Sequence, residues 1–189
     1  TTTGGDTTTG GDTTTGGDTT GGDPAPPGLG DVIVTEIMYD PAGDLDDSAD
    51  EYFELTNVTG TDRVLDGCIV ADDKPTTSEI ATLTIPAGGS VLFIASEENN
   101  HGLKGQLFDF SLGNGGDAIS LICGDLTIDS VDYSKEGFPP AKGEALSLSP
   151  DAYTEIDNNI GANWCLATNP FYDGPKGPNF GTPGAPNEA

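Results

Sequence analysis

The residues of this chain that could do chemistry are mostly carboxylates, because 32 acidic side chains accompany a single histidine, His101. Glu36 and Glu54 lie in two runs where acidic and apolar residues alternate, so they could face each other across paired strands. A facing pair resembles the acid and base of a glycosidase. Strands of so acidic a chain present such pairs by chance, and no serine–histidine–aspartate order can be built around His101. We predict no catalytic residues and no enzyme.

A second group of carboxylates could hold a metal ion. Residues 40–51 contain six acidic side chains, and calcium takes six to eight oxygen ligands in flexible geometry. The expected ligands are Asp44, Asp46, Asp47 and Asp50, with Asp72 and Asp73 as a weaker second site. The spacing is not that of an EF-hand, and a solvated loop without any ion is the alternative. No motif requires a cofactor, and calcium is the one that these residues could accept.

Three cysteines, Cys68, Cys123 and Cys165, indicate an oxidising compartment with one disulfide and one spare thiol. None forms a Cys-x-x-Cys pair, so no local zinc motif exists. Three different pairs of these cysteines could form the disulfide. The alternative is that all three cysteines are reduced and buried. We favour Cys68–Cys165 because it would tie down a Pro/Gly-rich tail and close a long loop, leaving Cys123 spare.

Residues 1–23 are a low-complexity Thr-Gly-Gly-Asp repeat of three hexads and a pentad. It offers no apolar position for a core, so it is either a flexible tether before the proline-rich spacer 24–27 or an ordered assembly arm. Clustered threonines could also carry O-glycans. The threonines concerned are Thr1, Thr2, Thr3, Thr7, Thr8, Thr9, Thr13, Thr14, Thr15, Thr19 and Thr20.

The charge of the whole chain limits its partners and its location. A formal net charge of -26 repels nucleic acids and anionic membranes, so we expect no nucleic-acid partner. The chain contains no run of 18 apolar residues, so we predict no transmembrane segment. The first residue is not Met and no signal-peptide pattern is present, which indicates a mature product or a fragment. With its cysteines, the chain is expected to be extracellular or at the cell surface.

From residue 31 onward, short runs rich in β-branched residues alternate with Gly, Pro, Asp and Asn, which is the rhythm of an all-β sandwich. We expect no helix, an irregular wrap from Gly161 onward, and a buried Trp164. The expected strands are Val32–Tyr39, Tyr52–Val58, Cys68–Ala71, Ile80–Ile85, Val91–Ala95, Phe108–Leu112, Ala118–Cys123, Thr127–Tyr133 and Ala145–Leu148.

A series of sequence blocks, in order, resembles the lamin tail domain of the bacterial extracellular type. The blocks are Val34–Pro41, Glu51–Asn57, Leu65–Cys68, Ile85–Val91, Ser111–Ile119, Ile128–Tyr133, Ala162–Cys165 and Gly181–Asn187. The resemblance implies an immunoglobulin-like β-sandwich that serves as a structural or binding module. It supplies no catalytic residues, and the nuclear partners of lamins are not transferred to so acidic a chain.

These observations predict two parts, a repeat and spacer over residues 1–28 and a lamin-tail-like sandwich over residues 29–189. The predicted function is a self-assembling extracellular structural protein, a fibre or surface-layer subunit that forms a homo-oligomer or polymer. The alternative is a surface-tethered binding module, calcium-dependent or not, with the repeat as a spacer. An accessory domain of a hydrolase would require a longer parent chain.

Overall fold

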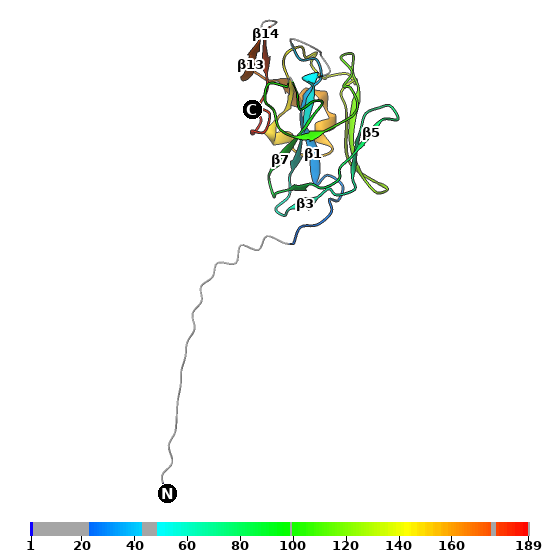
Figure 1. The fold of residues 1–189 in the computed structure, drawn as a ribbon, viewed down its shortest axis with the longest axis vertical. Coiled ribbons are helices and arrows are strands. Elements are labelled where there is room, and N and C mark those ends of the chain that lie inside the picture. Colours follow the sequence, from blue (N-terminus) through cyan, green and yellow to red (C-terminus); the bar gives the residue numbers. More distant parts are fainter. Residues whose placement is uncertain (2–22, 43–48, 99, 175–176, 189) are drawn as a thin grey trace.

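Two β-sheets face each other in the computed structural model, which describes residues 1, 23–42, 49–98, 100–174 and 177–188 (Figure 1). The larger sheet has the order β12 (Trp164–Leu166), β11 (Leu146–Leu148), β1 (Val32–Met38), β2 (Tyr52–Asn57), β7 (Ser90–Ile94) and β8 (Gln106–Leu107). The smaller sheet has the order β10 (Leu126–Asp132), β9 (Ala118–Cys123), β4 (Ile69–Ala71) and β5 (Thr77–Glu79). The arrangement confirms the predicted immunoglobulin-like sandwich.

Smaller elements close the sandwich at its ends. The pair β3 (Arg63–Val64) and β6 (Thr84–Ile85) lies at the end where residues 23–28 enter, and the hairpin β13 (Pro170–Gly174) and β14 (Gly177–Phe180) lies at the other end (Figure 1). Three single-turn 3-10 helices, η2 (Pro150–Ala152), η3 (Asp157–Asn159) and η4 (Gly161–Asn163), connect β11 to β12.

The two central strands of the larger sheet are buried on both faces. Every residue of β1 and β2 is buried. Their inner faces join the main core, where Phe53 stacks on Phe93 with ring centroids 5.0 Å apart. Their outer faces carry a second core that includes Met38 and Tyr52, with Phe180 packed against it. A strand buried on both faces leaves no solvent-facing side for its polar residues, so each of them needs a hydrogen-bond partner.

An aspartate links the two sheets where β1 bulges. The register of β1 against β2 shifts between Val34 and Glu36. The buried Asp129 of β10 accepts hydrogen bonds from the Val34 backbone N–H and from Asn158 Nδ2, both at 2.7 Å. Because a bulge leaves a backbone group without its ladder partner, the carboxylate replaces a missing strand hydrogen bond. The bulge therefore depends on a side chain from the opposite sheet.

The strand rhythm located most of the strands, and three expectations need correction. Phe108–Leu112 is not a strand; Phe108 and Phe110 pack against Phe53 in the core, and the neighbouring β8 pairs in parallel with β7. The expected strand Ile80–Ile85 contributes only its end, β6. The chain after residue 160 is irregular only in part, because η4, β12, β13 and β14 follow there and residues 181–188 cover the sandwich without helix or strand.

The buried tryptophan of β12 agrees with the sequence. Trp164 is 3 % exposed and its indole Nε1 donates to the Asn158 carbonyl at 2.7 Å. An indole N–H removed from water needs an acceptor, and the carbonyl at the end of η3 provides it. Trp164 therefore fixes the turn before β12 as well as filling the core.

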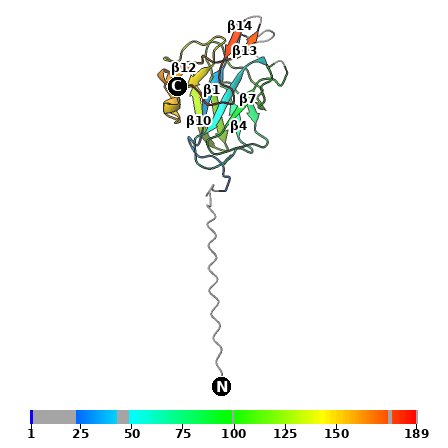
Figure 2. The same cartoon turned by 90° about the vertical axis from the view of Figure 1, so that its left-hand side faces the viewer.

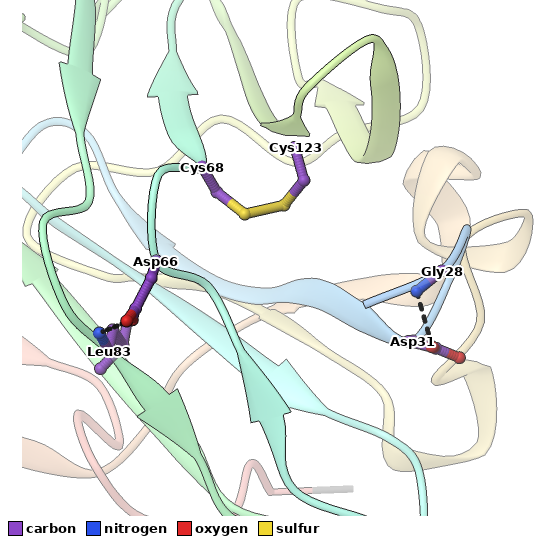
Figure 3. Close-up of a disulfide and its surroundings, with 6 residues drawn as sticks. All are labelled: Gly28, Asp31, Asp66, Cys68, Leu83 and Cys123. Carbon is purple, nitrogen blue, oxygen red and sulfur yellow. Dashed lines mark hydrogen bonds between the residues drawn. A yellow bond between two sulfur atoms is a disulfide. The ribbon is translucent and has the colours of Figure 1, made fainter. Parts of the chain in front are cut away.

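The disulfide joins Cys68 to Cys123, so the expected pairing of Cys68 with Cys165 is wrong (Figure 3). Cys68 immediately precedes β4 and Cys123 ends β9, and the register of these neighbouring strands places Ile69 opposite Ile122. The two cysteines are therefore cross-strand neighbours, with Cα atoms 4.2 Å apart. Cys165 lies on β12, at the edge of the other sheet, and is exposed with a free thiol. The adjacency of β4 and β9 in the smaller sheet determines which cysteines pair, and the length of the loop that the disulfide closes does not.

We predict that Cys123→Ser lowers the free energy of unfolding by about 2–4 kcal/mol, because the bridge closes a 55-residue separation, while Cys165→Ser leaves it unchanged. Urea unfolding of both variants and non-reducing peptide mapping of the native chain measure this. A native bridge that contains Cys165 would contradict the assignment.

Candidate functional site

Two buried glutamates face each other on the outer side of the larger sheet. The register pairs Glu36 of β1 with Glu54 of β2, as the alternating sequence predicted. The same row continues to Ser147 on β11, opposite Glu36, and to Leu92 on β7, opposite Glu54. Glu36 is 0 % exposed and Glu54 is 1 % exposed. The sheet thus places two carboxylates side by side, away from water.

The chain's C-terminal segment supplies the donors for Glu36. We call residues Gly181–Asn187 the C-terminal clasp, because this segment lies over the row of carboxylates. Thr182 donates to Glu36 through its backbone N–H at 2.9 Å and through its hydroxyl at 2.5 Å. The hydroxyl of Tyr52 donates to the same carboxylate. A Cβ at Gly181 would collide with this hydroxyl and with Glu36, so glycine is needed there.

The clasp also holds Glu54 and the neighbouring backbone. Gly184 donates its N–H to Glu54 Oε2 at 3.0 Å, and the Thr35 hydroxyl donates to Oε1 at 3.0 Å. Asn187 Nδ2 donates to the carbonyl oxygens of Thr35 at 2.7 Å and Leu148 at 3.0 Å. The clasp therefore ties β1, β2 and β11 together through polar contacts.

Burial makes these carboxylates weaker acids. Burial raises the pKa of Glu36 above its usual value, and the hydrogen bonds from Thr182 and Tyr52 oppose the rise. Burial, followed by the charge of Glu36, raises the pKa of Glu54 to about 7. Burial and Glu36 together raise the pKa of Tyr52 well above its usual value. The site thus favours a proton or another positive charge near neutral pH.

Glu54 lines a surface cavity, whereas Glu36 lies beneath the clasp. The cavity has a volume of about 280 Å³ and lies between the turn at Gly88–Ser90, Tyr153 and the clasp. Among the described residues, no ion pair includes Glu36 or Glu54. A carboxylate pair in which one member is sealed and held by three donor groups cannot serve both sides of a glycosidic bond.

The predicted calcium ligands are only partly described. Asp44, Asp46 and Asp47 lie outside the described residues. Asp50 is 6 % exposed, and its Oδ2 lies 3.2 Å from His101 Nε2. His101 is thus brought to the last of the four predicted calcium ligands.

The weaker calcium candidate gains a third carboxylate in the structure. Oxygens of Asp72, Asp73 and Asp117 lie within 4.8 Å of one another. Lys74 Nζ lies among them, 3.1 Å from Asp117 and 3.6 Å from Asp72. Although burial opposes ionisation, hydrogen bonds from the Ala118 and Asp73 N–H groups lower the pKa of Asp117. Asp117, which the sequence did not single out as a ligand, is brought to Asp72 by the pairing of β4 with β9.

The predicted repeat threonines lie outside the described residues, except Thr1, which is exposed.

The spacer that follows the repeat contacts the sandwich. Ala25 pairs in parallel with Arg63, and Pro27 is buried.

We predict that the chain loses stability as pH rises from 5.5 to 8. In the folded state the pKa values of Glu36, Glu54 and Asp129 are raised above their usual values. Their protonated forms therefore stabilise the fold fully at a pH below the unfolded-state pKa, and this stabilisation is lost as the pH rises through the folded-state pKa. For Glu54, a pKa of about 7 instead of 4.5 corresponds to at most roughly 3 kcal/mol.

Urea unfolding at both pH values measures this loss. Glu54→Gln should reduce it, and Glu79→Gln on the exposed side of β5 should not. Equal losses in the native chain and in Glu54→Gln would contradict the prediction.

The comparisons with known proteins agree with this geometry. The family model of the Lamin Tail Domain matches residues 25–135, which run from the docked spacer through β10 and include Glu36 and Glu54. No curated protein matches the chain. In the described part of the chain, no helix is long and apolar enough to cross a membrane. The sandwich fold agrees with a family-model match over more than half of the chain, and this match places the protein in the lamin tail domain family.

Proposed function

We propose that this chain is a non-enzymatic extracellular structural protein that self-assembles, as a fibre or surface-layer subunit, through its sandwich and its N-terminal repeat. The observation that carries the proposal is the way the spacer after the repeat joins the sandwich. Ala25 donates its N–H to the Asp62 carbonyl at 3.3 Å and accepts from the Val64 N–H at 2.9 Å. The spacer is thus added as a parallel neighbour of β3.

This attachment gives the repeat a fixed origin. Arg63 Nε lies 3.0 Å from Asp31 Oδ2, and the Gly28 N–H donates to the same oxygen at 2.7 Å, so the entry of the spacer is held by charge and by hydrogen bonds. The origin lies at the end of the sandwich opposite β13 and β14 (Figures 1 and 2). An arm that leaves one end can reach the opposite end of the next subunit, which favours head-to-tail polymers over closed dimers.

Two further features suit an extracellular assembly. The buried disulfide is typical of an oxidising compartment. Cys165 offers an exposed thiol on an edge strand, where a bond to another subunit would reinforce a polymer. O-glycans on the repeat threonines would keep such arms solvated.

The alternative is a surface-tethered binding module that uses calcium. The approach of Asp72, Asp73 and Asp117 favours it, together with the acidic loop that ends at Asp50. Calcium at the first group would have to displace the Lys74 ammonium, which already compensates the carboxylates there. The loop site is therefore the better of the two under this alternative.

The test compares the intact chain, a variant without residues 1–23, and a variant whose repeat is replaced by a Gly/Ser spacer of equal length. The spacer variant keeps length and removes the threonines and aspartates. We expect polymers only from the intact chain, measured by light scattering after size-exclusion chromatography and by negative-stain imaging. A parallel arm with Cys165→Ser separates disulfide cross-linking from assembly by the arm.

Polymers from the deleted variant, or an intact chain that stays monomeric at every concentration measured, would contradict the proposal. The second outcome would favour the tethered binding module.

A further inference from the structure

We propose that the cavity over Glu54 binds a primary ammonium group, namely the side chain of a lysine in a basic segment of a partner protein. This assignment goes beyond self-assembly and holds whether or not the chain polymerises.

The cavity has the size and the walls that a lysine side chain needs. Its volume is about 280 Å³, and its lining includes Tyr153 and Pro186. Glu54 and Thr56 also line it and are buried, so they form its base. Ser90 adds a hydroxyl that lies 2.8 Å from the Thr56 hydroxyl. A lysine carries three donors at the end of an apolar stem, so the stem would lie along Tyr153 and the ammonium would meet the oxygens at the base.

The buried carboxylates lack a positive charge of their own. The described ion pairs involve Asp31, Asp40, Asp50, Asp72, Asp73, Asp117 and Asp132, and none involves Glu36 or Glu54. Two adjacent buried carboxylates without a counter-charge repel each other and favour an incoming cation. Tyr153 adds an aromatic ring whose face attracts ammonium groups.

The cation must come from a partner, because this chain has few basic residues to offer. It has six, against 32 acidic residues. Arg63, Lys74, Lys135 and Lys142 already pair with carboxylates of their own surroundings. A net charge of -26 attracts basic segments over long range and raises their rate of encounter.

A proton competes with lysine for Glu54. The titratable groups that face Glu54 are Glu36 of β1, Tyr52 of β2 and Tyr153 beyond η2, and the hydrogen-bonding hydroxyls belong to Thr35 and Ser90. With a pKa of about 7, Glu54 is mostly neutral at pH 6 and mostly charged at pH 8. Lysine stays protonated at both values. Affinity should therefore rise about tenfold between pH 6 and pH 8.

The experiment titrates the full chain with a short lysine-containing peptide and follows the amide NMR signals of Gly88, Gly89 and Ser90. We expect saturable shifts at pH 8 that are about tenfold weaker at pH 6. The same peptide with norleucine, which keeps the stem and lacks the charge, should not bind. Butylamine is the free-amine arm: binding equal to that of the lysine peptide would show a small-amine site and overturn the assignment to a partner's lysine.

Two variants complete the test. Glu54→Gln should abolish the shifts, and Glu98→Gln, on an exposed loop, should leave them unchanged. Ala185→Lys changes an exposed residue at the rim of the cavity and supplies a competing ammonium, so it should weaken peptide binding at least tenfold even if Glu54→Gln proves unstable. Absence of saturable shifts at pH 8, or full binding by Ala185→Lys, would overturn the proposal.

Discussion

The burial of two carboxylates in the central strands is the constraint on which the rest of this structure depends. A carboxylate taken out of water costs several kcal/mol unless donors replace the lost solvation. Glu36 and Glu54 face each other on β1 and β2, where neither face of the sheet reaches solvent. Tyr52 and Thr35 supply donors from the sheet itself, and the remaining donors come from the clasp, 146 residues after Glu36 in the case of Thr182. The sandwich is thus completed only when the end of the chain returns to its first strands.

The sequence predicted the sandwich because local signals carry it. The alternation around Glu36 and Glu54 placed both residues on one side of paired strands, and the turn signals separated most of the strands correctly. The sequence predicted a C-terminal wrap but not its contacts with the carboxylates, because no local pattern relates Thr182 to Glu36. The cysteine pairing was wrong for a similar reason, since strand order in the smaller sheet, and not loop length, makes Cys68 a neighbour of Cys123. The sequence predicted Asp72 and Asp73 as a weaker site but missed Asp117, because only the pairing of β4 with β9 brings this residue near them.

The buried pair of Glu36 and Glu54 is related to both proposals, self-assembly and the binding of a partner's lysine. The C-terminal clasp covers the central strands β1 and β2, so the domain is a closed unit. The arm enters this unit at β3, which suits a repeating subunit. The clasp also builds one wall of the cavity over Glu54. The cavity lies close to that entry point, because Ala87, next to the cavity residue Gly88, donates its N–H to Asp62, whose carbonyl accepts from Ala25. The family match ends at residue 135, so the clasp lies outside the matched residues.

Amide hydrogen exchange of the clasp tests this account most directly. If the clasp completes the sandwich, the N–H groups of Thr182 and Gly184, which donate to Glu36 and Glu54, exchange as slowly as those of β1 and β2. The exposed N–H of Gly60, in the loop after β2, serves as the fast reference. Exchange of Thr182 and Gly184 at the rate of Gly60 would contradict the account.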